Sequence, residues 1–302
     1  MKLGYVTALF PEWTLEEHLS FAARTGYQCV EVMCWPVGKA ERRYAGVTHI
    51  DVATLSEARI RSIQRSCIAT GVSISGLGYY PNPLDPDPQV RADAAQHIIK
   101  VIEAAAALQI GVVNTFIGRD PSRMVDDQWQ EMLDLWGPIV DFASKHQVKI
   151  GIENCPMLFS RDEWPGGKNL ATTPAIWRKL FNSFPGRTLG LNFDPSHLVF
   201  QHIDYLRCIR EFGERFYHVH AKDTRIDPDR IYEVGSMGLK WYTPKIPGLG
   251  DVQWGRFFSE LTDTGYQGAV CVEVEDRVFE ATLESRKQSL VQSYRYLHQF
   301  FA

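Results

Sequence analysis

Several features that would direct a chain to a membrane or an oxidising compartment are missing from this sequence. No apolar run approaches the length of a membrane-spanning helix. The N-terminal stretch MKLGYVTALF carries one Lys and reaches Pro11 and Glu12 too soon for a secretory signal. The six cysteines form no CxxC pair, and several lie inside apolar runs, where a reduced Cys packs as a small hydrophobe. We therefore expect a cytoplasmic protein that has no membrane partner.

The sequence also lacks a run of Lys and Arg long enough to follow a phosphate backbone. Its formal net charge is −4, which disfavours nucleic acid as the principal partner. A small molecule is the expected ligand. The oligomeric state stays open, with a homo-oligomer as one option.

What the sequence does contain is a regular alternation of short β-rich apolar runs and longer amphipathic runs over all 302 residues. This pattern has no break in composition. It predicts a single domain, residues 1–302, that folds as one closed (β/α)₈ barrel, a TIM barrel, rather than a doubly wound sheet. The strands are expected at 3–9, 29–35, 72–80, 112–118, 148–154, 189–194, 216–223 and 269–275, and the helices near 14–25, 53–70, 88–109, 122–146, 174–184, 203–212, 253–264 and 280–300.

The expected helix-to-strand connections are short, whereas two strand-to-helix connections are long, at about 154–173 and 224–252. In a barrel of this kind, all strand-to-helix loops lie on one face, which is also the face of the active site. Connections of this length in a compact domain usually cover or line a binding site.

A repeated phrase, TGYQCVEV at 25–32 and TGYQGAVCVEV at 264–274, marks two equivalent helix-to-strand joints. In each, Gly is expected in the left-handed conformation that ends a helix. Glu273 lies eight residues after Gly265, but Glu31 lies only five after Gly26. At roughly 3.3 Å per residue, Glu31 should lie about 10 Å lower in its strand. Glu273 is thus expected at the functional rim and Glu31 in the barrel interior.

Four polar residues end four consecutive expected strands, the fifth to the eighth, at comparable height: Glu153, Asp194, His220 and Glu273. Three carboxylates converging on one point repel one another unless a cation lies between them. Internal salt bridges are the alternative. Hard oxygen ligands with no thiolate favour one divalent ion, with Mn²⁺ first and Mg²⁺ or Co²⁺ as options.

On the seventh strand, His218, His220 and Lys222 share a parity and should all face the interior. Lys222, near the barrel mouth, could polarise a substrate oxygen or orient a ligand carboxylate. Glu275 faces the same way as Glu273 but higher, where it could contact a substrate hydroxyl. An ordinary ion pair with Asp223 at the strand end is the competing interpretation for Lys222, and a solvated charge at the rim is the competing interpretation for Glu275.

The segments VKIGIEN, LNFDPSH, YHVHAKD, PGLGDVQW and CVEVED resemble successive motifs of the sugar phosphate isomerase/epimerase superfamily, the xylose isomerase-like barrels. The resemblance covers nearly the whole chain. It implies that Glu153, Asp194, His220 and Glu273 bind the metal and that Glu153 and Glu273 also act as catalytic acid and base. It further implies that His197 and the basic Arg225 bind substrate.

The resemblance implies a metal-dependent sugar isomerase or epimerase that removes a proton beside a carbonyl through a metal-stabilised enediolate. A lyase or dehydratase acting on a keto-sugar, keto-glycoside or keto-inositol is the alternative, because the same enolate can expel a β-substituent. The related abasic-site nucleases carry extra metal ligands, whereas this sequence has Tyr79, Tyr80, Phe116 and Ile117 at two of those places. A non-catalytic barrel used as a scaffold is the remaining hypothesis.

Overall fold

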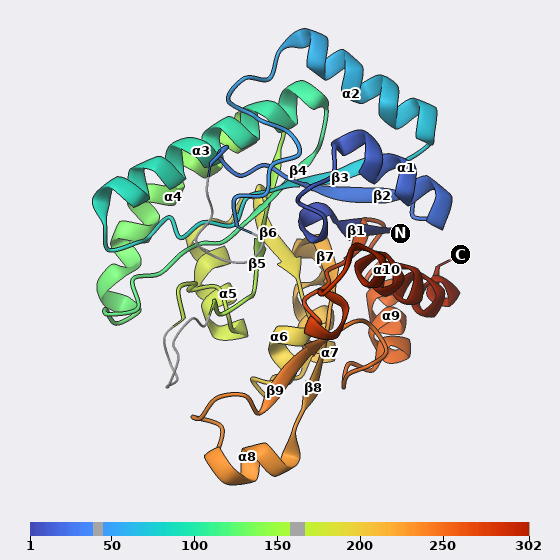
Figure 1. Cartoon of the computed structure of the whole chain (residues 1–302). Helices are drawn as coiled ribbons and strands as arrows, with labels where there is room; N and C mark the ends of the chain where they lie inside the picture. The colour runs from blue at the N-terminus through green and yellow to red at the C-terminus, as the bar shows by residue number, and fades with distance from the viewer. Residues whose placement is uncertain (39–44, 158–166, 302) are drawn as a thin grey trace.

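The computed structural model describes residues 1–38, 45–157 and 167–301. Eight parallel strands form a closed barrel in the order β1-β10-β7-β6-β5-β4-β3-β2 (Figure 1). The predicted (β/α)₈ fold is therefore confirmed. The barrel strands are β1 (Lys2–Val6), β2 (Cys29–Met33), β3 (Ser73–Gly78), β4 (Val112–Thr115), β5 (Lys149–Glu153), β6 (Leu189–Phe193), β7 (Phe216–Ala221) and β10 (Ala269–Val272).

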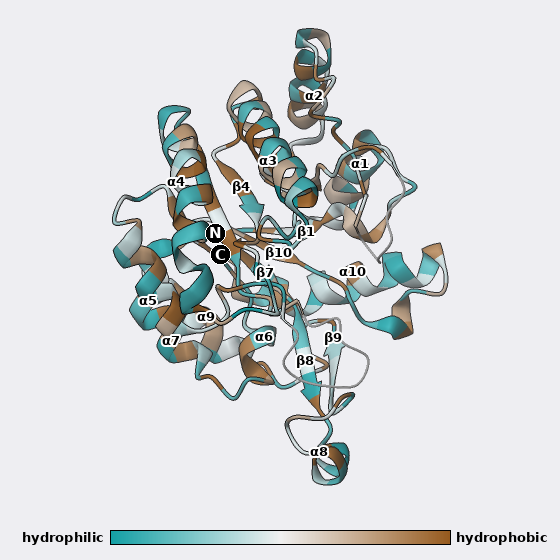
Figure 2. Cartoon of the chain, turned by 90° about the vertical axis from the view of Figure 1, so that its left-hand side faces the viewer, coloured by the Kyte–Doolittle hydropathy of each residue, from teal (hydrophilic) through white to brown (hydrophobic). Residues whose placement is uncertain are grey.

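Eight helices follow the barrel strands around the outside, and a shorter α6 (Ser196–Val199) comes directly after β6. Figure 2 shows that several of these helices are apolar on one side and polar on the other. Such amphipathic helices cover the strands with their apolar faces. The eight are α1 (Leu15–Thr25), α2 (Glu57–Thr70), α3 (Pro88–Leu108), α4 (Trp129–Lys145), α5 (Pro174–Ser183), α7 (Tyr205–Phe212), α9 (Trp254–Asp263) and α10 (Leu283–Leu297).

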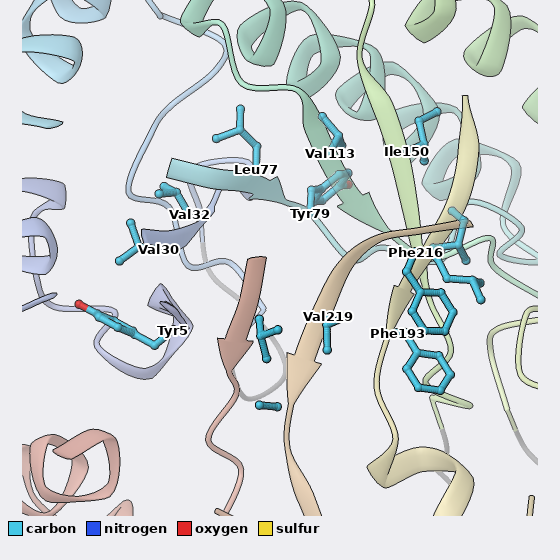
Figure 3. Close-up of a cluster of buried hydrophobic side chains, with 14 of the residues drawn as sticks. Tyr5, Val30, Val32, Leu77, Tyr79, Val113, Ile150, Phe193, Phe216 and Val219 are labelled. Carbon is cyan, nitrogen blue, oxygen red and sulfur yellow. The ribbon is translucent and has the colours of Figure 1, made fainter. Parts of the chain in front are cut away.

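Side-chain alternation along the strands separates an apolar layer from a polar barrel interior. Figure 3 shows part of the apolar layer, with Val30 and Val32 of β2 and Val219 of β7 among its members. On β7, the intervening His218 and His220 are fully buried but belong to no apolar cluster. This parity places polar side chains inside the barrel without interrupting the apolar core.

Both copies of the repeated phrase end a helix as expected. Gly26 and Gly265 adopt positive φ angles of 102° and 74°, a conformation that costs Gly little. Each joint then leads into a barrel strand, β2 or β10. The repeat is thus a structural connection that the barrel uses twice.

The connection 224–252 is not a plain loop. It contains β8 (Asp223–Ile226), α8 (Pro228–Val234) and β9 (Tyr242–Lys245), and β8 pairs with β9 as an antiparallel hairpin. Hairpin and helix project from the barrel at the bottom of Figure 1. The other expected long connection, 154–173, includes residues 158–166, which lie outside the described residues.

Candidate active site

The candidate site lies where four neighbouring strands end. Glu153 is the last residue of β5, Asp194 follows β6 directly, His220 lies on β7, and Glu273 follows β10 directly. Each of these residues offers a ligand atom, and the four atoms lie within 4.8 Å of one another. The structure therefore brings together the four side chains that the sequence predicted to converge.

Negative charge exceeds positive charge at this point. Lys222 Nζ lies 2.6 Å from Glu273 Oε2, 3.2 Å from Asp194 Oδ2 and 3.1 Å from Glu275 Oε2. One ammonium group therefore faces three carboxylates, and Glu153 adds a fourth. The excess negative charge of such a cluster is relieved either by a further bound cation or by protonation of one of the carboxylates.

His220 is held by a carboxylate from the opposite part of the barrel. Its Nε2 donates to Glu31 Oε2 at 2.6 Å, and the Tyr80 hydroxyl donates to the other oxygen of Glu31. His220 and Glu31 are both fully buried. With Nε2 donating, Nδ1 of a neutral His220 carries the free lone pair, the form in which imidazole binds a metal.

Two buried atoms in the cluster lack a hydrogen bond: His220 Nδ1 and Asp194 Oδ2. His220 Nδ1 lies 3.7 Å from Glu153 Oε1 and 3.6 Å from Glu273 Oε2. The other oxygen of Asp194 accepts from Ser196 N at 2.8 Å, which fixes the carboxylate. Asp194 Oδ2 lies 3.2 Å from Lys222 Nζ and 3.3 Å from His197 Nε2 without a hydrogen bond to either, and a divalent ion is a further partner that this oxygen-rich, thiolate-free set fits.

The two glutamates have opposite pKa shifts. Burial raises the pKa of Glu273 to about 7, against the lowering effect of Lys222. Burial also acts to raise the pKa of Glu153, but the hydrogen bond to His197 and the nearby charges of His220 and Lys222 outweigh it and lower the pKa below its usual range. The two carboxyl groups therefore differ in proton affinity even though they share one site.

His197 and Lys222 also face the cluster. His197, on α6, has its Nε2 3.2 Å from Glu153 Oε1 and 3.3 Å from Asp194 Oδ2. Burial tends to lower the pKa of Lys222, but Glu273, Glu275 and the other carboxylates raise it well above its usual value. Lys222 is thus held as a cation inside the barrel mouth.

The structure does not bring Arg225 into the cavity, so its predicted contact with substrate stays a prediction. Arg225 lies on β8, is exposed and does not line the cavity above the cluster, whereas its neighbour Thr224 does. Successive strand side chains point to opposite sides, so β8 turns Arg225 outward. Within residues 1–38, 45–157 and 167–301, Arg277, after β10, is the arginine that lines the cavity.

The cavity measures about 410 Å³, within the usual range for small-molecule sites. One side carries the charged groups Glu153, Lys222, Glu273 and Glu275. The remaining wall is largely apolar and aromatic. It includes Val6, Ala8, Met33, Trp35, Phe116, Met157, Phe200 and Tyr242.

Two features of the site were not identified from sequence. Glu31 was expected in the interior but not as the partner of His220, and Cys155 was not singled out although it lines the cavity beside His197. Cys155 follows Glu153 by two residues, and in an extended chain residues two apart point to the same side, so this spacing indicates that Cys155 also faces the site. No comparable signal linked Glu31 to His220.

Comparison with known proteins places this chain in a family. Residues 19–299 match the family model described as "Xylose isomerase-like TIM barrel". The chain therefore belongs to the xylose isomerase-like TIM barrel family.

Two curated relatives are informative. The chain is 27% identical to the uncharacterized protein YfiH of Bacillus subtilis, over 97% of this chain and 99% of that one. It is 25% identical to an inosose dehydratase of Clostridium tetani, over 59% of this chain and 57% of that enzyme. The match to the dehydratase thus spans less than two thirds of its length.

Solved structures show the same fold at low identity. D-psicose 3-epimerase from Clostridium cellulolyticum, with D-tagatose, matches with a TM-score of 0.71 at 14% identity over 99% of each chain. The IOLI protein with a bound zinc atom matches with a TM-score of 0.73 at 16% identity over 100% of each chain. Known members of the superfamily thus include epimerases, dehydratases and a zinc-bound protein.

Among the described residues, no helix is long and apolar enough to cross a membrane.

Proposed function

We propose that this protein is a divalent-metal-dependent enzyme that isomerises or epimerises a sugar by removing a proton next to a carbonyl group. The observation that carries the proposal is the convergence of Glu153, Asp194, His220 and Glu273 within 4.8 Å beneath a cavity of about 410 Å³. We assign these four residues as the metal ligands, with Mn²⁺ as the preferred ion and Mg²⁺ or Co²⁺ as substitutes.

A divalent ion held there would act as a Lewis acid toward the negative charge that develops on a substrate oxygen. Glu153 and Glu273 come from strands three positions apart in the ring. We assign them as the pair in which one removes the proton and the other returns one. His197 and Lys222 would bind substrate oxygens, and Glu275 would accept from a hydroxyl at the mouth.

A lyase acting on a keto-sugar, keto-glycoside or keto-inositol is the second candidate. Two observations favour it: the similarity to inosose dehydratases, and a cavity with a large apolar wall, which would accommodate more than one sugar ring. Both candidates begin with the same proton removal. They differ in whether the carbanion is reprotonated or expels a neighbouring group.

Proton NMR in D₂O tests the shared step. The Mg²⁺-loaded protein would be incubated with ketoses, aldoses, keto-inositols and 3-keto-glycosides, and loss of a C–H signal recorded. We expect exchange that requires metal and falls at least about 100-fold in Glu153→Gln and Glu273→Gln. The surface variant Glu284→Gln should match the wild type. A rearranged sugar identifies an isomerase, and an eliminated fragment identifies a lyase.

Absence of exchange across the panel, in protein shown to hold metal, would contradict both candidates. Failure to bind metal at all would support the scaffold hypothesis.

A further inference from the structure

A second cluster of ligand groups lies beside the first. Cys155, two residues beyond the end of β5, His197 on α6, and Glu153 each offer one ligand atom, and the three atoms lie within 4.8 Å of one another. All three residues line the cavity. Glu153 belongs to both clusters, and its carboxylate has two oxygens to offer.

The donor set of this second cluster differs from that of the first. A thiolate, an imidazole and a carboxylate form a softer set, which favours Zn²⁺ over Mg²⁺ or Mn²⁺. We propose that Glu153, Cys155 and His197 form a second divalent-metal site, selective for zinc, next to the four-residue site. Three protein ligands leave the fourth tetrahedral position to water or substrate.

The position of the thiol is unusual within the chain. Cys29, Cys34, Cys208 and Cys271 are buried, and Cys67 is half-buried on α2. None of these five lines the cavity. Among the described residues, Cys155 is thus the cysteine that combines access to the cavity with a neighbouring imidazole and carboxylate.

His197 presents one ring nitrogen to two carboxylates, of which Glu153 accepts its proton, and a bound zinc ion would take the place of that proton. His197 Nε2 lies 3.2 Å from Glu153 Oε1 and 3.3 Å from Asp194 Oδ2, so one nitrogen faces two carboxylates. Asp194 Oδ2 is buried and has no hydrogen bond. Carboxylates shared between neighbouring ions are common in two-metal sites, where the ions lie roughly 3.5–4 Å apart.

A third group, Glu31, His218 and His220, also has three ligand atoms within 4.8 Å. We assign it no ion. Its members are fully buried and do not line the cavity, and His220 Nε2 already donates to Glu31.

Zinc in the second site would use the His197 nitrogen that the proposed function gives to a substrate hydroxyl. Because the same ion would also hold Glu153, excess zinc should raise the KM and lower the kcat of the enzyme, and both effects should weaken when Cys155 is replaced. This consequence rests on the proposed function. The metal site itself does not.

Cobalt serves as the spectroscopic probe for the site. Protein stripped with a chelator would be titrated with Co²⁺, and the near-ultraviolet charge-transfer band of a cobalt–thiolate bond recorded. We expect the band in the wild type, loss of the band in Cys155→Ser, and an unchanged band in the matched control Cys67→Ser. Zinc content after dialysis should fall from about two ions per chain to about one in Cys155→Ser.

The same titration of His220→Gln separates this site from the proposed catalytic one. The variant should lose the first ion and the deuterium exchange but keep the charge-transfer band. No band in the wild type at saturating Co²⁺, or a band that persists in both Cys155→Ser and Cys155→Ala, would overturn the second site. Circular dichroism and thermal melting would verify that the variants fold.

Discussion

At the scale of single residues, Glu31 determines which nitrogen of His220 faces Glu153 and Glu273. The Glu31 carboxylate accepts from His220 Nε2 at 2.6 Å and from the Tyr80 hydroxyl. Replacing a carboxylate that supports a metal-binding His typically weakens metal binding 10- to 100-fold. Glu31 is therefore a positioning residue rather than a proposed ligand.

We expect Glu31→Gln to raise the Kd for Mn²⁺ by about 10- to 100-fold. Gln can still accept from Nε2, but it removes the negative charge that strengthens the imidazole as a ligand. Isothermal titration calorimetry on the chelator-treated protein measures the effect. Glu57→Gln on the exposed face of α2 is the control, and an unchanged Kd in Glu31→Gln would refute the role.

Part of this residue-scale picture was predictable from sequence. Glu153, Asp194, His220 and Glu273 were expected to converge because each ends a barrel strand. The contact between Glu31 and His220 joins residues 189 positions apart, and its length depends on strand tilt and register, which the sequence pattern does not specify. The orientation of Arg225 was predictable, because the alternation that turns His220 and Lys222 inward continues through Thr224 and turns Arg225 outward.

At the scale of elements, the β8–β9 hairpin is anchored by Asp223. This buried carboxylate accepts from the backbone N–H groups of Thr224, Gly248 and Val252 and from Trp254 Nε1, at 2.9–3.0 Å. The hairpin contributes Thr224, Tyr242 and Pro244 to the cavity wall. Asp223 thus holds the hairpin, which shapes the cavity, against the segment that leads into α9.

We expect Asp223→Ala to lower the free energy of unfolding by about 3 kcal/mol, because it leaves several buried donors unpaired. KM should rise more than kcat falls, since the hairpin lines the cavity but carries none of the proposed acid or base groups. Urea denaturation and steady-state kinetics measure the two effects. Asp227→Ala, which removes the N-cap of the exposed α8, should cost only about 1 kcal/mol.

The hairpin itself was not predicted. β9 is only four residues long and contains Pro244, and a proline weakens the pattern by which a strand is recognised. The eight barrel strands were found because each is an apolar run buried on the helix side. Elements that project away from the core lack that signal.

At the scale of the whole molecule, the proposed metal connects four adjacent strands, β5, β6, β7 and β10. A ligand that binds only the folded state stabilises it by about 2.7 kcal/mol when present at 100 times its Kd. We expect chelation to lower the Tm by several degrees, and Mn²⁺ to restore it. The variant His220→Gln should melt at the same temperature with and without Mn²⁺. Equal melting of wild type with and without metal would contradict the site.

A second whole-molecule prediction concerns acid. His18 and His49 form a buried pair beyond the end of β1, with their Nε2 atoms 3.1 Å apart. Burial lowers the pKa of His49 from its usual 6.5 to about 4, and burial together with His49 lowers the pKa of His18 to about 2. Both rings are therefore neutral in the folded protein and gain a proton more readily when unfolded.

Below about pH 6.5 the unfolded state binds more protons than the folded state. The contribution of this pair to the free energy of unfolding is therefore complete above that pH and declines as the pH falls toward the pKa values of the folded protein. We expect the loss to reach about 1.4 kcal/mol per pH unit for each histidine in this window. Urea denaturation between about pH 7.5 and about pH 5 measures it. In His49→Gln the free energy of unfolding should decline less steeply with falling pH. The exposed control His146→Gln should follow the wild type. Equal declines in the wild type and both variants would disprove the role of the buried histidine pair.

Part of the apolar wall of the cavity comes from the N-terminal half of the chain, whose described residues contribute none of the cavity's charged groups. Val6, Ala8, Met33, Trp35 and Phe116 precede β5, whereas Glu153, Lys222, Glu273 and Glu275 come from β5 onward. Within the part of the chain that the structure describes, the charged groups therefore come from the second half alone, whereas the apolar wall draws on both halves, since Met157, Phe200 and Tyr242 also line it. A laboratory library confined to Val6, Ala8, Trp35 and Phe116 would vary which molecules fit while leaving the proposed reacting groups, and the Glu31 carboxylate that holds His220, unchanged.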